Sequence, residues 1–188
     1  MDKKQFFLFA LYVGAQSFLL QLVDQLIGKS LVPGGHSGFV FIAFQGWALY
    51  FLLGSTLKGA VTAFCGYIMG VLFSILMVGG SGVLAGLDIL AVPVVALIVV
   101  PVMMYFEYAP WCIANVATFF VGAGAFFGVL NYVEGIRIAE ASFIVLLYCA
   151  FGLASGYMTI WFRKRYECCK RLEKQDVNRY RIGGGKRT

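Results

Sequence analysis

Five amides and hydroxyls lie inside otherwise apolar stretches of the sequence, where their hydrogen-bonding groups are out of reach of bulk water. They are Gln21, Gln45, Thr62, Asn115 and Thr118. Polar side chains are costly in hydrocarbon, so they usually face neighbouring helices or a water-filled space. The pattern therefore indicates one of two arrangements: hydrogen bonds that join helices along their seams, or a polar path for a small solute.

Three charged residues near the ends of apolar stretches form a second group of candidates. Asp24 follows the first stretch, Lys58 separates the second from the third, and Glu107 follows the fourth. Lys58 can extend its long side chain to the membrane surface and is expected to set orientation. Glu107 would pair with Lys58, guard an inner mouth or lie in a solvated loop. Asp24 or Glu107 would be the coupling charge of an ion-driven carrier.

Catalysis is not indicated by the motifs. The chain contains a single histidine, His36, and it lacks the GxSxG, HExxH and phosphate-cradling glycine patterns. Its five cysteines show no spacing typical of a zinc site. The sequence therefore predicts a protein that is not an enzyme and that binds no metal and no cofactor.

Composition places these candidate residues in a membrane protein. Of the 188 residues, 61% are hydrophobic and only 13% are charged, a balance typical of membrane chains. With about 20 apolar residues for each crossing, the sequence predicts an all-α polytopic bundle of six transmembrane helices. The predicted spans are Phe6–Val23, Phe39–Leu57, Gly59–Val78, Ile89–Phe106, Cys112–Leu130 and Ser142–Phe162.

Glycine and proline leave two interpretations of the region around the fourth span. Residues 79–88 are rich in glycine, and Pro93 and Pro101 interrupt the apolar run that follows. The fourth helix could be kinked at these prolines, or part of 79–93 could enter the membrane and return within protein. The alternative fold is therefore five spans plus a re-entrant segment.

Basic residues are concentrated at one end of the chain. Residues 163–188 contain ten basic and three acidic side chains, whereas residues 1–162 contain five basic and six acidic ones. Cytoplasmic segments beside a membrane are enriched in Lys and Arg, so both termini are predicted to lie in the cytoplasm. The chain then divides into a helical bundle, residues 1–162, and a basic cytoplasmic tail, residues 163–188.

Basic and aromatic side chains are interleaved in this tail, which suits anionic lipid headgroups. The residues predicted to bind lipid are Arg163, Lys164, Arg165, Lys170 and Arg171. A tail held at a membrane favours lipid over nucleic acid as its partner.

Pairs of glycines four residues apart recur along the chain and allow helix backbones to approach closely. These pairs are Gly66/Gly70, Gly82/Gly86, Gly124/Gly128 and Gly152/Gly156. They predict a tightly packed bundle, and a narrow lumen lined by glycine and alanine is the second interpretation. A bundle this small seldom encloses a large cavity alone, so a homo-oligomer is also predicted.

Three short motifs resemble those of a known family. They are Gly46-Trp-Ala-x-Tyr-Phe51, Leu57-Lys58-Gly59 and Pro110-x-x-x-x-Asn115-x-Ala117-Thr118-Phe119. Through them, residues 40–162 resemble the YcdZ-like bacterial inner-membrane proteins, whose domain has no known function. In that family a Pro-Gly pair precedes the fifth helix, and Trp111 stands in place of the glycine here. The resemblance implies a small multi-pass protein of the bacterial inner membrane and implies no substrate.

The combined pattern predicts an integral membrane channel or facilitator for a small, mostly uncharged solute, with the five amides and hydroxyls along its path. The predicted spans hold too few charges to coordinate a multiply charged substrate. Two alternatives stay open. One is a membrane scaffold that anchors its basic tail at anionic lipid, and the other is an ion-coupled carrier of a small solute.

Overall fold

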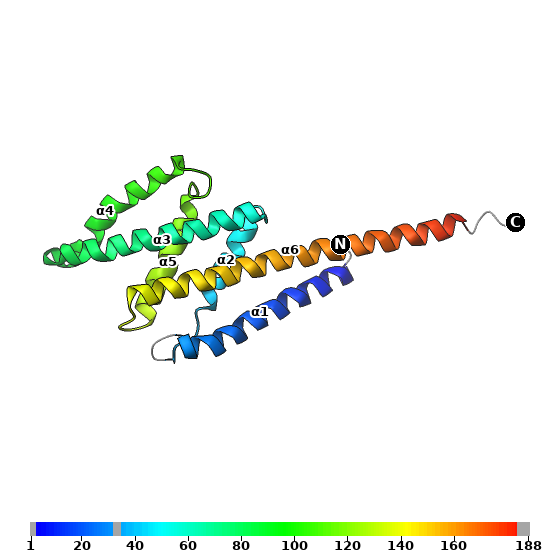
Figure 1. The fold of residues 1–188 in the computed structure, drawn as a ribbon, viewed down its shortest axis with the longest axis horizontal. Coiled ribbons are helices and arrows are strands. Elements are labelled where there is room, and N and C mark those ends of the chain that lie inside the picture. The colour runs from blue at the N-terminus through cyan, green and yellow to red at the C-terminus, as the bar shows by residue number, and fades with distance from the viewer. Residues whose placement is uncertain (1–2, 32–34, 184–188) are drawn as a thin grey trace.

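The computed structural model describes residues 3–31 and 35–183, which form helices joined by short turns (Figure 1). No strand occurs in these two ranges, so the predicted all-α class is confirmed. Two short 3₁₀ helices flank the fourth α-helix. The elements are α1 (Lys3–Leu31), α2 (Val40–Leu52), α3 (Leu57–Val83), η2 (Ala85–Leu90), α4 (Ala91–Met104), η3 (Tyr105–Tyr108), α5 (Val116–Tyr132) and α6 (Ile138–Gly183).

Four segments of the described chain are long and apolar enough to cross a membrane. They are Phe6–Gly28, Leu57–Val83, Ala85–Tyr108 and Ile138–Cys168. The other two helices are apolar but short, with 13 residues in α2 and 17 in α5. At 1.5 Å per residue they extend about 20 and about 26 Å, less than the roughly 30 Å of a hydrocarbon core. A helical membrane protein is therefore supported, and six spans remain a prediction.

The second predicted span is too long at its C-terminal end. It was expected to reach Leu57, but α2 ends at Leu52. The turn that follows holds Gly54 and Ser55 at φ values of 85° and 55°, in the left-handed region that interrupts a helix. The hydroxyl of Thr56 then accepts a hydrogen bond from the backbone N–H of Gly59 (3.0 Å) and caps α3.

The fifth predicted span begins too early. It was expected to start at Cys112, but residues 110–115 form turns and α5 begins at Val116. Pro110 opens the first of these turns, where its carbonyl accepts a hydrogen bond from the N–H of Ile113 (2.9 Å). Asn115 is therefore the N-cap residue of α5 rather than a residue inside the helix.

The glycine-rich stretch after α3 forms the end of that helix and a short 3₁₀ helix. Residues 79–83 complete α3, and residues 85–90 form η2, which leads directly into α4. A re-entrant backbone must be buried in protein or line a cavity, but η2 has no buried residue. This stretch forms the corner between α3 and α4 (Figure 1). The exposure of η2 does not favour the re-entrant alternative, which stays a prediction.

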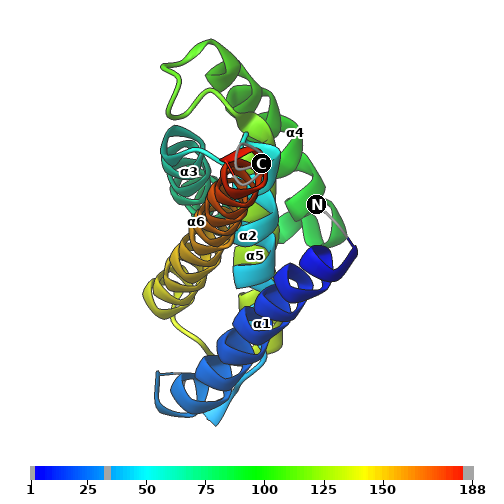
Figure 2. The ribbon, with the colours of Figure 1, turned by 90° about the vertical axis from the view of Figure 1, so that its right-hand side faces the viewer.

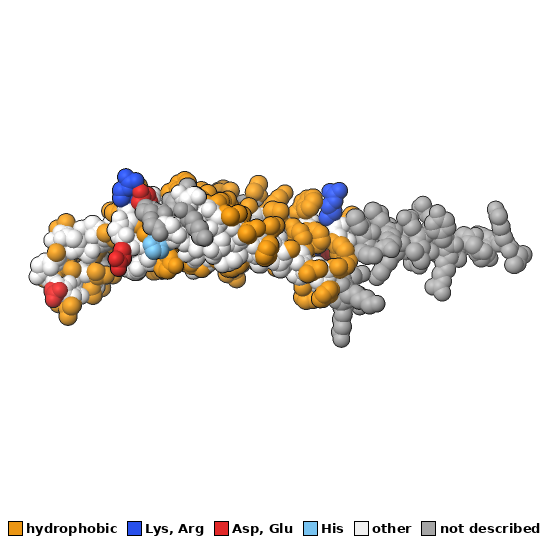
Figure 3. Space-filling view, turned by 90° about the horizontal axis from the view of Figure 1, so that it is seen from below, with side chains coloured by type: hydrophobic (Ala, Val, Ile, Leu, Met, Phe, Trp, Pro, Cys, Tyr) orange, Lys and Arg blue, Asp and Glu red, His pale blue; other side chains and the backbone are white. Residues whose placement is uncertain are grey.

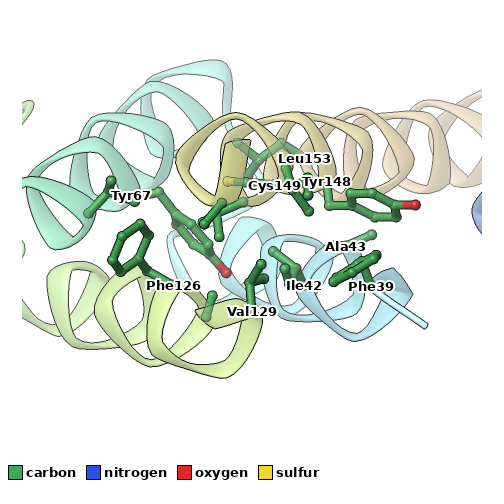
Figure 4. Close-up of a cluster of buried hydrophobic side chains, with 14 of the residues drawn as sticks. Phe39, Ile42, Ala43, Tyr67, Phe126, Val129, Tyr148, Cys149 and Leu153 are labelled. Atoms are coloured by element: carbon green, nitrogen blue, oxygen red, sulfur yellow. The ribbon is translucent and has the colours of Figure 1, made fainter. Parts of the chain in front are cut away.

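The core lies between α2, α3, α5 and α6. Figure 4 shows Phe39 and Ile42 of α2 and its N-cap meeting Tyr67 of α3 and Phe126 and Val129 of α5, and all five are almost fully buried. In the same view α2 and α5 run in opposite directions past each other. Large side chains fill the centre of the bundle, so the described residues enclose no open lumen in this conformation.

Glycines bring two pairs of helices into backbone contact. Between α3 and α5, a Cβ atom at Gly70 would lie 2.7 Å from the backbone nitrogen of Ala123. Between α2 and α6, a Cβ atom at Gly46 would lie 2.9 Å from the carbonyl oxygen of Cys149, and one at Gly152 would lie 2.9 Å from the nitrogen of Trp47. No side chain fits at these positions unless the helices separate.

The remaining helices lie at the periphery. Figure 2 shows α1 and α4 flanking the central elements, and few residues of either helix are buried. The sixth helix continues beyond the bundle toward the C-terminus (Figure 1). In Figure 3 the middle of the visible face is dominated by hydrophobic side chains, and the charged ones lie toward its ends. This distribution suits a bundle whose flanks face lipid.

We expect Gly152→Ala to destabilise the bundle by about 1–3 kcal/mol, because its methyl group would be forced into the backbone of α2. Gly82→Ala is the matched control, since a Cβ atom there meets nothing within 4 Å. That substitution should leave stability unchanged or raise it by about 0.5–1 kcal/mol. Thermal unfolding of the two variants in detergent measures the difference, and equal melting temperatures would contradict the close-contact geometry.

Candidate functional site

A pocket of about 630 Å³ opens beside the turns that precede α5. This volume lies within the range of sites that hold small molecules. The pocket is formed by α3, the end of α4, η3, the turns and the start of α5. Its lining residues are Thr62, Met104, Glu107, Trp111, Ala114, Asn115, Val116, Ala117 and Phe120. Two of the five predicted path residues, and one of the three predicted mouth charges, therefore meet at one place.

Asn115 lines this pocket from its position at the N-cap of α5. Its backbone carbonyl accepts hydrogen bonds from the N–H (3.1 Å) and hydroxyl (2.6 Å) of Thr118. Its own side chain makes no capping hydrogen bond. An asparagine at this position usually caps the helix with its side-chain oxygen. Here the backbone cap leaves the amide available to a ligand in the pocket.

Thr62 is the residue through which α3 contacts the turn that carries Trp111. Its hydroxyl lies 3.1 Å from the carbonyl oxygen of Lys58 in its own helix and 3.4 Å from that of Trp111 across the seam. The ammonium group of Lys58 lies 4.9 Å from the centre of the Trp111 ring, a favourable cation–π distance. These contacts fix the turn that carries Trp111 against the first turns of α3.

Thr118 is packed in the seam between α3 and α5 and does not line the pocket. Its side chain is 1% exposed and lies directly against Gly66. The hydroxyl is occupied by its hydrogen bond to the carbonyl of Asn115. Thr118 was predicted to lie along the solute path with Asn115, but in the structure it builds the start of α5.

The charged candidates have separate positions. Glu107 is exposed and lines the pocket, and no ion pair joins it to Lys58 within the described part of the chain. The option that these two side chains pair is therefore not realised in the structure. Gln21 and Gln45 lie on exposed faces of α1 and α2, away from the pocket lining. The five predicted path residues do not follow one continuous path in a single chain.

The side chain of Asp24 is enclosed by protein and does not open to a solute path. Its carboxylate is 0% exposed and accepts hydrogen bonds from the N–H groups of Gly38 (2.7 Å) and Phe39 (3.0 Å) and from the hydroxyl of Tyr148 (2.6 Å). The two N–H groups precede α2, where a negative charge is favourable. Asp24 thus caps α2 from another helix and ties α1 to both α2 and α6.

A second polar contact between α1 and α6 escaped sequence reasoning. The side-chain oxygen of Gln16 accepts a hydrogen bond from the hydroxyl of Thr159 (2.7 Å), and its nitrogen lies 3.3 Å from the carbonyl oxygen of Ser155. The available signal was that Gln16 and Thr159 interrupt apolar runs. The pairing of residues so far apart in sequence left no local pattern.

The start of the predicted lipid-binding tail is exposed at the end of the bundle. Arg163 forms an ion pair with Glu167 (3.1 Å) and lies 5.9 Å from the ring centre of Phe9. Arg165 lies 5.4 Å from the ring of Trp161. Lys164 is also exposed. The side chains of Lys170 and Arg171 lie outside those that the structure describes.

Residues 10–164 match the sequence profile of a family described as "Protein of unknown function (DUF1097)". No curated protein and no solved structure matches the chain.

We expect Asp24→Asn to lower the free energy of unfolding by about 1–3 kcal/mol, because an amide cannot accept all three hydrogen bonds and carries no charge. Tyr148→Phe removes only one of these bonds and should cost about 1 kcal/mol. Glu134→Gln, an exposed carboxylate on the same side of the bundle, serves as the control. The melting temperature in detergent should decrease most for Asp24→Asn, less for Tyr148→Phe and not at all for Glu134→Gln. An unchanged melting temperature for Asp24→Asn would exclude the capping role.

Proposed function

The chain belongs to the DUF1097 family of proteins of unknown function, and from that premise we propose that it is a membrane facilitator for a small, mostly uncharged solute. The pocket beside α5 supports this proposal. It combines the amide of Asn115 and the hydroxyl of Thr62 with the aromatic side chains of Trp111 and Phe120. Apolar walls with a few polar groups are typical of small-molecule sites. A transport role rather than a catalytic one is part of the proposal.

In this proposal the solute is bound before it crosses. Tyr67 and Phe126 fill the bundle core, and Thr118 closes the seam beside the pocket. A facilitator with a binding step therefore fits the described conformation better than a permanently open pore. Passage would require α5 or the turns before it to move relative to α3.

The proposed topology has six spans in the inner membrane of a bacterium, with both ends in the cytoplasm. The ring of Tyr12 in α1 stacks on that of Phe162 in α6 with centroids 3.9 Å apart. Asp24, near the other end of α1, meets Tyr148. These two contacts make α1 and α6 antiparallel, so the start of the chain and the start of the tail share one side. The excess of basic residues there supports the cytoplasm as that side.

An ion-coupled carrier is supported only through Glu107. Asp24 already accepts three hydrogen bonds in a fully buried position, whereas Glu107 is exposed at the pocket. A membrane scaffold is supported by the exposed Arg163, Lys164 and Arg165, which would contact anionic headgroups. Both alternatives are distinguished from the facilitator by the flux experiment below.

We expect Asn115→Leu to reduce solute flux at least tenfold with little change in melting temperature, because the amide faces the pocket and makes no capping hydrogen bond. Thr118→Val should show the opposite pattern, losing about 1 kcal/mol of stability with its buried hydrogen bond. Purified protein in liposomes can be tested by swelling with glycerol, urea and acetamide. Leu97→Ala, on the exposed face of α4, is the control.

Unchanged flux in Asn115→Leu would contradict the pocket as the route. If the intact protein carries none of the three solutes, the facilitator proposal fails and the scaffold is favoured. Flux that depends on pH and loses this dependence in Glu107→Gln would instead support the ion-coupled carrier.

We expect a membrane-impermeant maleimide to label Cys168 only from the cytoplasmic side, because it lies exposed on α6 beyond the predicted last span Ser142–Phe162. The measurement compares intact cells with inverted membrane vesicles. The variant Cys168→Ser separates this signal from that of the other native thiols. Labelling of Cys168 in intact cells would overturn the proposed orientation.

A further inference from the structure

Gln45 is an amide on the outside of the bundle with no hydrogen-bond partner among the described residues. It lies near the middle of α2, between Phe44 and Gly46, and its side chain is exposed. None of the described residues forms a hydrogen bond with it. In α2, a helix of high apolarity, such an amide would face hydrocarbon, which offers neither a donor nor an acceptor.

The surface beside Gln45 is open and lined by small residues. Phe41 lies in α2, one turn before Gln45, and its ring packs against α5. A Cβ atom at Gly128 of α5 would be 3.5 Å from this ring. Because α2 and α5 run in opposite directions (Figure 4), Gly124 lies one turn further in the same direction as Gln45. A Cβ atom at Gly124 would meet nothing within 4 Å. Another helix can therefore approach this face closely.

The two helices that form this face are both short, whereas α4 is extended by η2 and η3 into an apolar segment of 24 residues. At about 20 and about 26 Å, α2 and α5 are shorter than the hydrocarbon core. Lipid against such a face must thin, and short membrane helices avoid this by associating with other protein. Helix length therefore favours a protein partner independently of the amide.

We propose that the face formed by Phe41, Gln45 and Ala48 of α2 and Gly124 of α5 binds a second copy of this chain. A glutamine amide both donates and accepts hydrogen bonds, so Gln45 can pair with the partner's Gln45 about a twofold axis. This pairing gives both amides a hydrogen-bond partner without a third molecule. It depends only on α2 lying within the membrane and not on the proposed transport.

The first test is disulfide cross-linking in native membranes, in a variant whose five cysteines are replaced by alanine. Ala48→Cys, one turn from Gln45 on the same exposed face, should form a covalent dimer on mild oxidation. Leu97→Cys is the control, because Leu97 is 75% exposed on α4. Cross-linking at Leu97→Cys as strong as that at Ala48→Cys, or none at Ala48→Cys, would overturn the proposal.

The second test isolates the amide. Gln45→Leu should raise the dimer dissociation constant about 5- to 30-fold, the range for a hydrogen bond between membrane helices. Gln21→Leu removes the exposed amide of α1 and should leave the constant unchanged. Single-molecule photobleaching of labelled protein over a lipid dilution series measures both. An equal effect of the two substitutions, or a monomer at every dilution, would contradict the interface. Neither cross-linking nor photobleaching measures flux, so the dimer proposal and the transport proposal are tested independently.

Discussion

Direct contact between helix backbones is the constraint on which the rest of this structure depends. Gly70 and Gly122 let α3 and α5 touch, and Gly46 and Gly152 do the same for α2 and α6. Hydrocarbon provides no hydrophobic force that would hold apolar helices together, so close packing has to supply it. These contacts fix the start of α5 against α3, which places the turns before α5 and hence the pocket. The site exists because glycines let the backbones of α3 and α5 meet.

Hydrogen-bond satisfaction separates the polar groups by role. Asp24, Gln16 and Thr118 are buried and have partners within the chain. Asp24 and Gln16 join one helix to another, and Thr118 builds the start of its own helix. Asn115 and Gln45 have amides without such partners, one at a pocket and the other on an open face. Within the membrane, such groups cannot rely on water as a hydrogen-bond partner. The satisfied groups therefore explain the architecture, and the unsatisfied ones indicate what the protein meets.

The sequence predicted the helical class and the approximate position of each helix, because apolar length is a local property. It placed Asn115 inside a helix, since an uninterrupted apolar run conceals the turns from Pro110 onward. It grouped Gln45 with Thr62, yet only the three-dimensional packing decides which face of α2 is covered. The bond between Asp24 and Tyr148 joins residues 124 positions apart. No periodic pattern encodes such a pairing, so the role of Asp24 had to come from the structure.

The uninterrupted length of α6 has a mechanical consequence. Its 46 residues form a rod of about 69 Å that begins in the bundle, contains the seam glycine Gly152 and continues into the basic segment. A helix resists bending and twisting far more than a loop does. A torque applied to the basic segment would therefore be transmitted along α6 to its contact with α2 at Gly152.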